Sequence, residues 1–132
     1  MEETTVQLQL QLLQKGGPFR IAKGPKPTPA PGEVLIKQRV IAFNLLDIKQ
    51  RDRGLGITEW PWVMGIEGAG LVEAVGSDVQ HLQPGDEVAG WEGSGGLPEP
   101  WGGAFQEYVA IPEHFLAKKP RNITLEEAAS LP

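Results

Sequence analysis

The sequence predicts a mainly β fold, a barrel or sandwich with little helix, and three observations support this. The 17 glycines and 12 prolines among 132 residues interrupt the chain too often for long helices. About seven short runs have the apolar and β-branched composition of strands. Turn signals separate these runs at spacings of about 8–12 residues, which are typical of all-β barrels and sandwiches.

The expected strands begin near the amino terminus. Residues 6–12 alternate strictly between apolar and polar side chains, which predicts a strand with one buried face. After a turn at 15–18, residues 19–22 are expected to form a short return strand. Four prolines within residues 23–31 predict an extended connector that cannot lie inside a sheet. Residues 33–43 are the strongest strand candidate in the chain.

The rest of the chain continues with short elements. Residues 44–51 favour a short helical turn, because their apolar residues are suitably spaced, and Gly54 is expected to end it. Thr124 and Glu127 have the spacing of a capping box, so a second helix is expected to begin at Thr124. Further strands are expected at 71–75, 87–91, 105–111 and 115–117, and loops at 77–83 and 92–103.

Residues 62–76 are the most informative stretch. Their glycines, set among small and branched apolar residues, predict backbone that turns tightly and packs closely. Glu67 lies in the middle of this apolar run, where an unpaired charge would be costly. Glu67 therefore needs a partner in the fold or has a chemical role.

Composition and charge exclude several function classes. The formal net charge of −5 and the pI near 5.0 argue against nucleic acid binding, because no basic stripe is present to neutralise phosphates. Without cysteine, the chain has no disulfide, no thiolate metal site and no thiol nucleophile. No run approaches the roughly 20 apolar residues of a membrane span, and no signal peptide is evident. We therefore expect a cytoplasmic location and no membrane contact.

Six blocks of the sequence carry a resemblance to a known family: residues 31–37, 42–52, 62–76, 84–88, 103–109 and 126–132. In order and spacing they resemble the amino-terminal GroES-like catalytic domain of medium-chain dehydrogenases/reductases. The resemblance implies a partly open GroES-like barrel with short helices, as a single domain over residues 1–132. The nearest similarity is to zinc-free quinone and enoyl reductases, including the fungal trans-enoyl reductases.

The resemblance also implies a zinc-free member. Zinc-dependent members carry Gly-His-Glu where this chain has Gly65-Ile66-Glu67, and they carry cysteines that this chain lacks. Zinc prefers thiolate and imidazole ligands, and the two histidines, His81 and His114, lie outside every block. No metal site is therefore expected.

Enzymes of this kind continue into a Rossmann domain that binds NADPH, but no G-x-G-x-x-G follows a strand and opens a helix in this sequence. The nucleotide-binding domain is thus expected to be absent. The resemblance implies the substrate-side domain of a zinc-independent, NADPH-dependent oxidoreductase that reduces an activated alkene or quinone, with NADPH bound only where a Rossmann domain is supplied.

The alternative is a stand-alone, non-redox GroES-like protein. It would be an accessory or binding module, or a cofactor-free isomerase or cyclase in a biosynthetic pathway. The expected partners are a small-molecule substrate and, over the exposed face of the domain, a partner chain or a second copy.

Hydride transfer to an activated alkene or quinone needs a group that stabilises the developing negative charge on oxygen. The resemblance makes Lys49 the catalytic candidate and Asn44 a residue of the substrate and cofactor cleft. The alternatives are a solvated lysine on a helical turn and an asparagine that caps the helix after it.

Four further residues are candidates for the same cleft. Asp47 is expected to be mainly structural, as a salt-bridged or capping carboxylate. Glu67 is expected to bond buried backbone or a basic residue rather than to act as a general base. Trp62 and Trp91, together with Trp101, could line an apolar pocket, although large aromatic residues in a small β domain are more often core or rim.

Overall fold

A computed structural model describes residues 6–92 and 103–132 of the chain. The expected loop at 92–103, with Trp101, lies outside the described residues except at its two ends. The elements, in chain order, are β1 (Val6–Leu12), β2 (Phe19–Pro25), β3 (Glu33–Ala42), α1 (Leu45–Arg53), β4 (Trp62–Val63), β5 (Glu67–Val75), β6 (Glu87–Trp91), β7 (Tyr108–Pro112), a 3-10 turn (Glu113–Phe115), β8 (Leu116–Lys118) and α2 (Leu125–Ala129).

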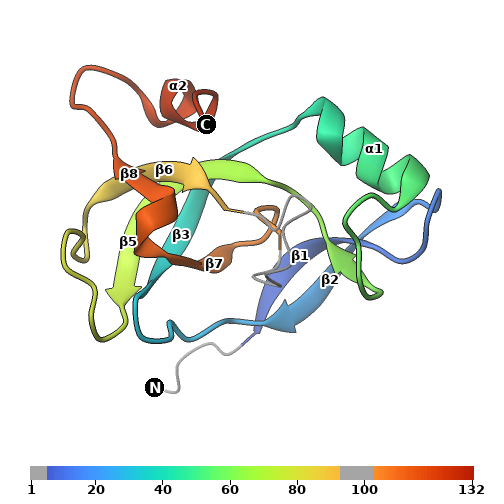
Figure 1. The fold of residues 1–132 in the computed structure, drawn as a ribbon, viewed down its shortest axis with the longest axis horizontal. Coiled ribbons are helices and arrows are strands. Elements are labelled where there is room, and N and C mark those ends of the chain that lie inside the picture. Colours follow the sequence, from blue (N-terminus) through green and yellow to red (C-terminus); the bar gives the residue numbers. More distant parts are fainter. Residues whose placement is uncertain (1–5, 93–102) are drawn as a thin grey trace.

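Two antiparallel sheets form the fold, as Figure 1 shows. One has the strand order β2-β1-β4 and the other β7-β3-β5-β6-β8. In Figure 1, α1 lies near the end of β3, and α2 lies beside β6. The sheets do not close into a complete barrel within the described residues, which confirms the expected mainly β, partly open GroES-like fold.

The segment before β7 joins the two sheets. Leu10 N donates to Phe105 O (2.9 Å), and Glu107 N donates to Leu8 O (3.2 Å), which ties the segment to β1. On its other side, Gln38 N of β3 donates to Glu107 O (2.9 Å). Residues 105–107 therefore form the hydrogen-bonded seam between the sheets, whereas the sequence predicted them as part of the last long strand.

The core consists of three apolar clusters. The largest lies within the five-stranded sheet and contains Val34, Ile36, Val72, Leu82, Val88, Val109 and Ile111. A second cluster lies where the sheets meet and contains Leu12, Trp62, Met64, Ala104 and Phe105. The third holds α2 against the five-stranded sheet through Ala69, Ala89, Ala128 and Ala129.

Strand β1 buries its glutamines and exposes much of its apolar face. Gln7, Gln9 and Gln11 are all buried, whereas Val6 and Leu8 are each 48% exposed. The alternation correctly predicted a strand with one buried face, but the buried face is the polar one over most of its length. Leu12 alone follows the opposite pattern, because it reaches the second core cluster.

The boundaries of several elements differ from the sequence prediction. Strand β2 continues to Pro25, into the expected connector. Among the described residues β2 is an edge strand that pairs with β1, and proline is tolerated at an edge because its missing N–H breaks no hydrogen bond of the sheet. Strand β5 begins at Glu67 rather than at Leu71. Gly70 therefore lies inside a strand, where a Cβ would come within 2.2 Å of Lys37 O, so close packing is its role.

The two helices begin and end where their capping residues require. Helix α1 runs to Arg53, slightly past the expected end, and stops at Gly54, which has φ 66° in the left-handed region. Helix α2 begins after Thr124, whose Oγ1 accepts a hydrogen bond from Glu127 N (3.1 Å), as its spacing predicted. Neither helix of the described residues is long and apolar enough to cross a membrane.

Candidate functional site

The polar centre of the molecule lies where β3 passes into α1. Asn44 has extended backbone at this junction, and its side-chain Nδ2 donates to Glu67 Oε1 on β5 (2.8 Å). Its backbone N–H donates to Asp47 Oδ2 in the first turn of α1 (2.7 Å). Asn44 therefore bridges two buried carboxylates, Glu67 and Asp47, which are 5% and 0% exposed.

These contacts show which group pairs with the buried carboxylate of Glu67. The partner of its carboxylate is a side-chain amide, and not the buried backbone or basic residue that the sequence suggested. Asp47 is a capping carboxylate, one of the two structural roles expected for it.

A third carboxyl group, that of Glu92, lies beyond the end of β6 and is fully buried. Gln38 Nε2 donates both to Glu92 Oε2 and to Ala104 O, the latter at 2.9 Å. No role was predicted for Gln38 or Glu92 from the sequence. The sequence does contain one indication that Glu92 is buried. If the alternation of β6 is extended by one residue, Glu92 falls on the same buried face as Val88 and Gly90.

Burial controls the protonation of this acidic cluster, which consists of Asp47, Glu67 and Glu92. Desolvation raises the pKa of Glu92 to about 8, against the hydrogen bond from Gln38, which lowers it, and the charge of Glu67 raises it further. Desolvation also raises the pKa of Asp47, the backbone hydrogen bond from Asn44 opposes this, and the charge of Glu67 adds to the increase. Glu92 therefore carries its proton at neutral pH.

The acidic cluster does not have the arrangement of a metal site. Among the described residues, no group of three or more histidine, cysteine, aspartate or glutamate side chains could hold a metal ion. Ile66, beside Glu67, is buried and supplies no ligand atom. His81 and His114 are both exposed and distant in sequence from the cluster.

Lys49 and Trp62 lie apart from the acidic cluster. In α1, Asp47 and Gln50 are buried, whereas Lys49 is exposed on the other side of the helix. Trp62 belongs to the second core cluster and packs with Leu12 and Met64. The structure thus joins Asn44, Asp47 and Glu67, places Lys49 on the adjoining surface, and gives Trp62 a packing environment. A cleft role for Trp62 and a catalytic role for Lys49 stay predictions.

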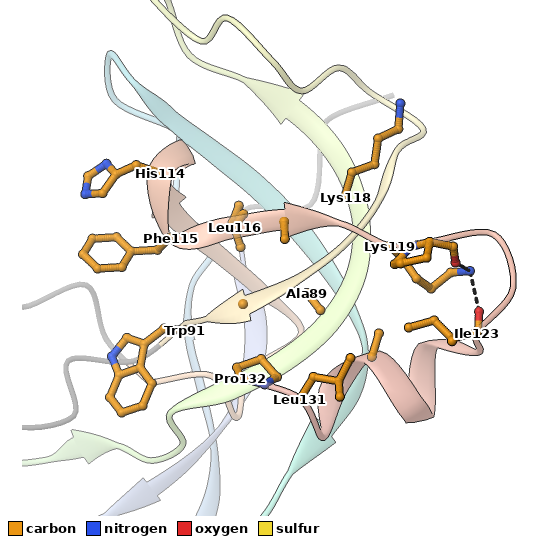
Figure 2. Close-up of a pocket in the computed structure, with 14 residues that line it drawn as sticks. Ala89, Trp91, His114, Phe115, Leu116, Lys118, Lys119, Ile123, Leu131 and Pro132 are labelled. Carbon is orange, nitrogen blue, oxygen red and sulfur yellow. Dashed lines mark hydrogen bonds between the residues drawn. The ribbon is translucent and has the colours of Figure 1, made fainter.

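Trp91 connects the acidic cluster with an apolar cavity. It is the direct antiparallel partner of Glu67, so the two side chains project from the same face of the sheet. Figure 2 shows Trp91 beside Phe115 and His114 at one side of a cavity of about 450 Å³. Leu131 and Pro132 form another wall, beyond the end of α2.

The polar groups around this cavity differ in their partners. Lys119 Nζ donates to Pro120 O (3.1 Å) and Ile123 O (2.7 Å), and the second of these bonds is dashed in Figure 2. The indole Nε1 of Trp91, in contrast, is buried without a hydrogen-bond partner among the described residues.

Two open antiparallel sheets, with a short helix directly after the long strand β3, define a GroES-like domain. Residues 30–121 match the family described as the alcohol dehydrogenase GroES-like domain, and the chain belongs to this family. It is an oxidoreductase-family domain related to enoyl and quinone reductases.

Curated relatives are similar over most of the chain. A zinc-type alcohol dehydrogenase-like protein of Staphylococcus aureus (strain COL) is 38% identical over 120 residues, which cover 91% of this chain and 34% of that protein. A trans-enoyl reductase of Aspergillus flavipes is 36% identical over 126 residues, which cover 92% of this chain and 36% of that protein. The chain thus spans about a third of the length of these relatives.

Solved structures show the same fold. A quinone oxidoreductase of Pseudomonas syringae pv. Tomato DC3000 superposes with a TM-score of 0.82 at 31% identity, covering 93% of this chain and 36% of that one. An alcohol dehydrogenase superfamily protein of Novosphingobium aromaticivorans superposes with a TM-score of 0.85 at 33% identity, and the match covers 96% of this chain and 38% of that one.

Proposed function

We propose that this chain is the substrate-side domain of a zinc-independent, NADPH-dependent oxidoreductase that reduces an activated alkene or quinone. The observation that carries the proposal is the hydrogen bond from Asn44 to Glu67 beside Ile66. The side chains beside Glu67 are the amide of Asn44 and the apolar side chain of Ile66, and the sequence has no cysteine. Zinc prefers thiolate and imidazole ligands, and neither kind is present at this position. The similarity to proteins named trans-enoyl reductase and quinone oxidoreductase supports the same reaction class.

We expect this chain to contact only the nicotinamide end of NADPH. Its described sheets are antiparallel, and the sequence has no glycine-rich turn between a strand and a helix for a pyrophosphate. The dinucleotide would therefore be held by a separate nucleotide-binding domain, in the same polypeptide or in another one. When bound, NADPH supplies the hydride. This chain would contribute Asn44 and Lys49 at the nicotinamide end.

The residues of this chain would position the substrate and stabilise its charge. The apolar cavity at Trp91 would take up the hydrocarbon part of the substrate. The ammonium group of Lys49 would donate to the oxygen on which negative charge develops. The exposure of Lys49 is consistent with a cleft that forms only between two domains.

A two-domain chimera tests the proposal. The nucleotide-binding part of the Pseudomonas syringae quinone oxidoreductase, joined to this chain, is expected to give an enzyme that oxidises NADPH with a quinone or an enone. Its activity should survive treatment with a chelator, and elemental analysis should find no stoichiometric zinc. A folded chimera that binds NADPH but reduces neither acceptor would contradict the proposal. Turnover of a substrate by the 132-residue chain without nicotinamide would favour the isomerase or cyclase alternative.

A further inference from the structure

An apolar surface crosses the seam between the two sheets. It consists of Leu8, Leu10, Ile21, Ile41, Phe43 and Phe105, from β1, β2, the end of β3 and the segment before β7; we call it the seam patch. Ile21 is 72% exposed and Phe43 is 59% exposed, while Leu8 and Ile41 are close to half exposed. Contiguous exposed apolar surface of this kind marks an interaction site more often than single exposed residues do.

The orientation of β1 creates the patch and holds it in place. Gln7 Nε2 and Gln9 Nε2 both donate to Gln106 Oε1 (2.8 and 3.0 Å), and Gln7 Oε1 accepts from Tyr108 N (2.6 Å). Turning the strand over to bury its leucines would break these partly buried hydrogen bonds. Strand β1 also pairs along its whole length with β2. The leucine face is therefore a fixed part of the surface.

The seam patch contains both a groove and an exposed apolar ring beside it. A groove of about 450 Å³ is lined by Leu8, Leu10 and Ile21 on one side and by Ile41 and Phe105 on the other. The exposed ring of Phe43 adjoins it and stacks on Phe105, with 6.1 Å between ring centroids. A hollow and an apolar side chain that could enter it thus lie in one continuous surface.

The charges at the groove are also complementary to each other. Arg39 and Glu107 both line it, and Arg39 lies in β3 at the register shift between Gln38 and Val40. Arg39 makes no salt bridge with another described residue. In a two-fold arrangement that sets Arg39 of one copy against Glu107 of the other, the same pair would form twice.

We propose that two copies of this chain associate through the seam patch across a two-fold axis. A two-fold interface buries the same surface on both subunits, so this surface has to be complementary to itself. The seam patch meets that requirement in shape, with a groove beside Phe43, and in charge, with Arg39 beside Glu107. A stable interface covers about 800 Å² per partner, roughly a tenth of the 7552 Å² surface of this chain. The proposal does not depend on the proposed reductase activity.

Sedimentation velocity over a concentration series tests this proposal, with neither nicotinamide nor substrate present. We expect the unmodified chain to form a dimer at micromolar concentration. Ile21→Lys should raise the dimer dissociation constant at least about tenfold, because a charge would be buried in the groove. Leu131→Lys is the matched control, since Leu131 is equally exposed (73%) but lies at the cavity beside α2, and it should leave the dimer intact. Circular dichroism would establish that both variants are folded.

The charge pair gives a second, independent test. Arg39→Glu would face Glu107 of the other copy, so we expect weaker association that added salt partly restores. Arg39→Lys should retain most of the affinity. A chain that stays monomeric up to about 100 μM would overturn the proposal. So would a dimer, or a larger assembly, that both Ile21→Lys and Arg39→Glu leave unchanged.

Discussion

At the scale of single residues, the acidic cluster shows how the fold accommodates buried charge. Glu67 interacts with both of the other carboxyl groups, and it raises the pKa of Asp47 and of Glu92. Its own partner is the amide of Asn44, a neutral donor that neutralises no charge. The cluster is therefore held together by two amides, those of Asn44 and Gln38, and by a proton on Glu92.

The first prediction concerns the amide of Asn44. Asn44→Ser keeps a good helix N-cap but removes the donor to Glu67, so we expect a loss of about 1–3 kcal/mol in the free energy of unfolding. Asn44→Asp should cost more near neutral pH, because it replaces the donor amide with another carboxyl group between Asp47 and Glu67. Urea unfolding would measure both. Asn122→Ser, at an exposed asparagine, is the control; equal stability of Asn44→Ser and this control would refute the role of Asn44.

The second prediction concerns the proton on Glu92. The folded protein holds this proton up to a pKa of about 8, whereas the unfolded chain releases it near 4.5. The stabilisation is therefore complete below about pH 4.5 and is lost as the pH rises toward about 8, at on the order of 1 kcal/mol per pH unit. Glu92→Gln mimics the protonated group and should remove this slope. A variant with the same pH slope as the unmodified chain, in urea unfolding at a series of pH values, would contradict the assignment.

How far the sequence predicts the site depends on the residue. Glu67 was found because it interrupts an apolar run, and Asn44 and Asp47 because they lie in a block that resembles a known family. Glu92 was missed since it adjoins a glycine-rich stretch, where a charged residue is usually solvated. Its burial depends on Gln38, which is 54 positions away in the sequence, so local pattern alone could not reveal it.

At the scale of elements, the pattern predicted most strands but did not decide which face of β1 is buried. Period-two alternation sets the two faces apart, and the partner segment then determines which of them points inward. Here that partner is Gln106, whose side chain can bind two glutamines. The same limit explains why the end of β2 and the role of residues 105–107 were not predicted. Their pairing depends on segments that local sequence pattern does not identify.

The third prediction concerns the close contact between β5 and β3. Gly70→Ala would bring a Cβ within 2.2 Å of the Lys37 backbone carbonyl, which cannot move without separating the two strands. We expect a loss of about 2–4 kcal/mol in thermal or urea unfolding. Gly17→Ala is the comparison, because its nearest contact is the adaptable side chain of Gln14, and the loss should be smaller. If the two variants were equally stable, close packing would not explain Gly70.

At the scale of the whole molecule, the two candidate surfaces arise from different parts of the fold. The cavity at Trp91 lies between the five-stranded sheet and the end of α2, whereas the seam patch lies across the seam between the two sheets. Two copies could therefore pair through the seam patch while the cavity stays open to a substrate. Neither surface could be predicted from local sequence, because each combines residues from at least three separate segments.

The fourth prediction concerns Lys49 and requires the complete two-domain enzyme. Lys49 is exposed on α1, so Lys49→Ala should leave the melting temperature unchanged. If its ammonium group stabilises the developing charge on the substrate, kcat of the chimera should fall by about 10²-fold or more with little change in KM. Lys23→Ala, at an exposed lysine of β2, is the matched control and should keep full activity. Equal kcat in the two variants would assign Lys49 to the solvated surface, and the charge on the substrate oxygen would then have to be met by another donor.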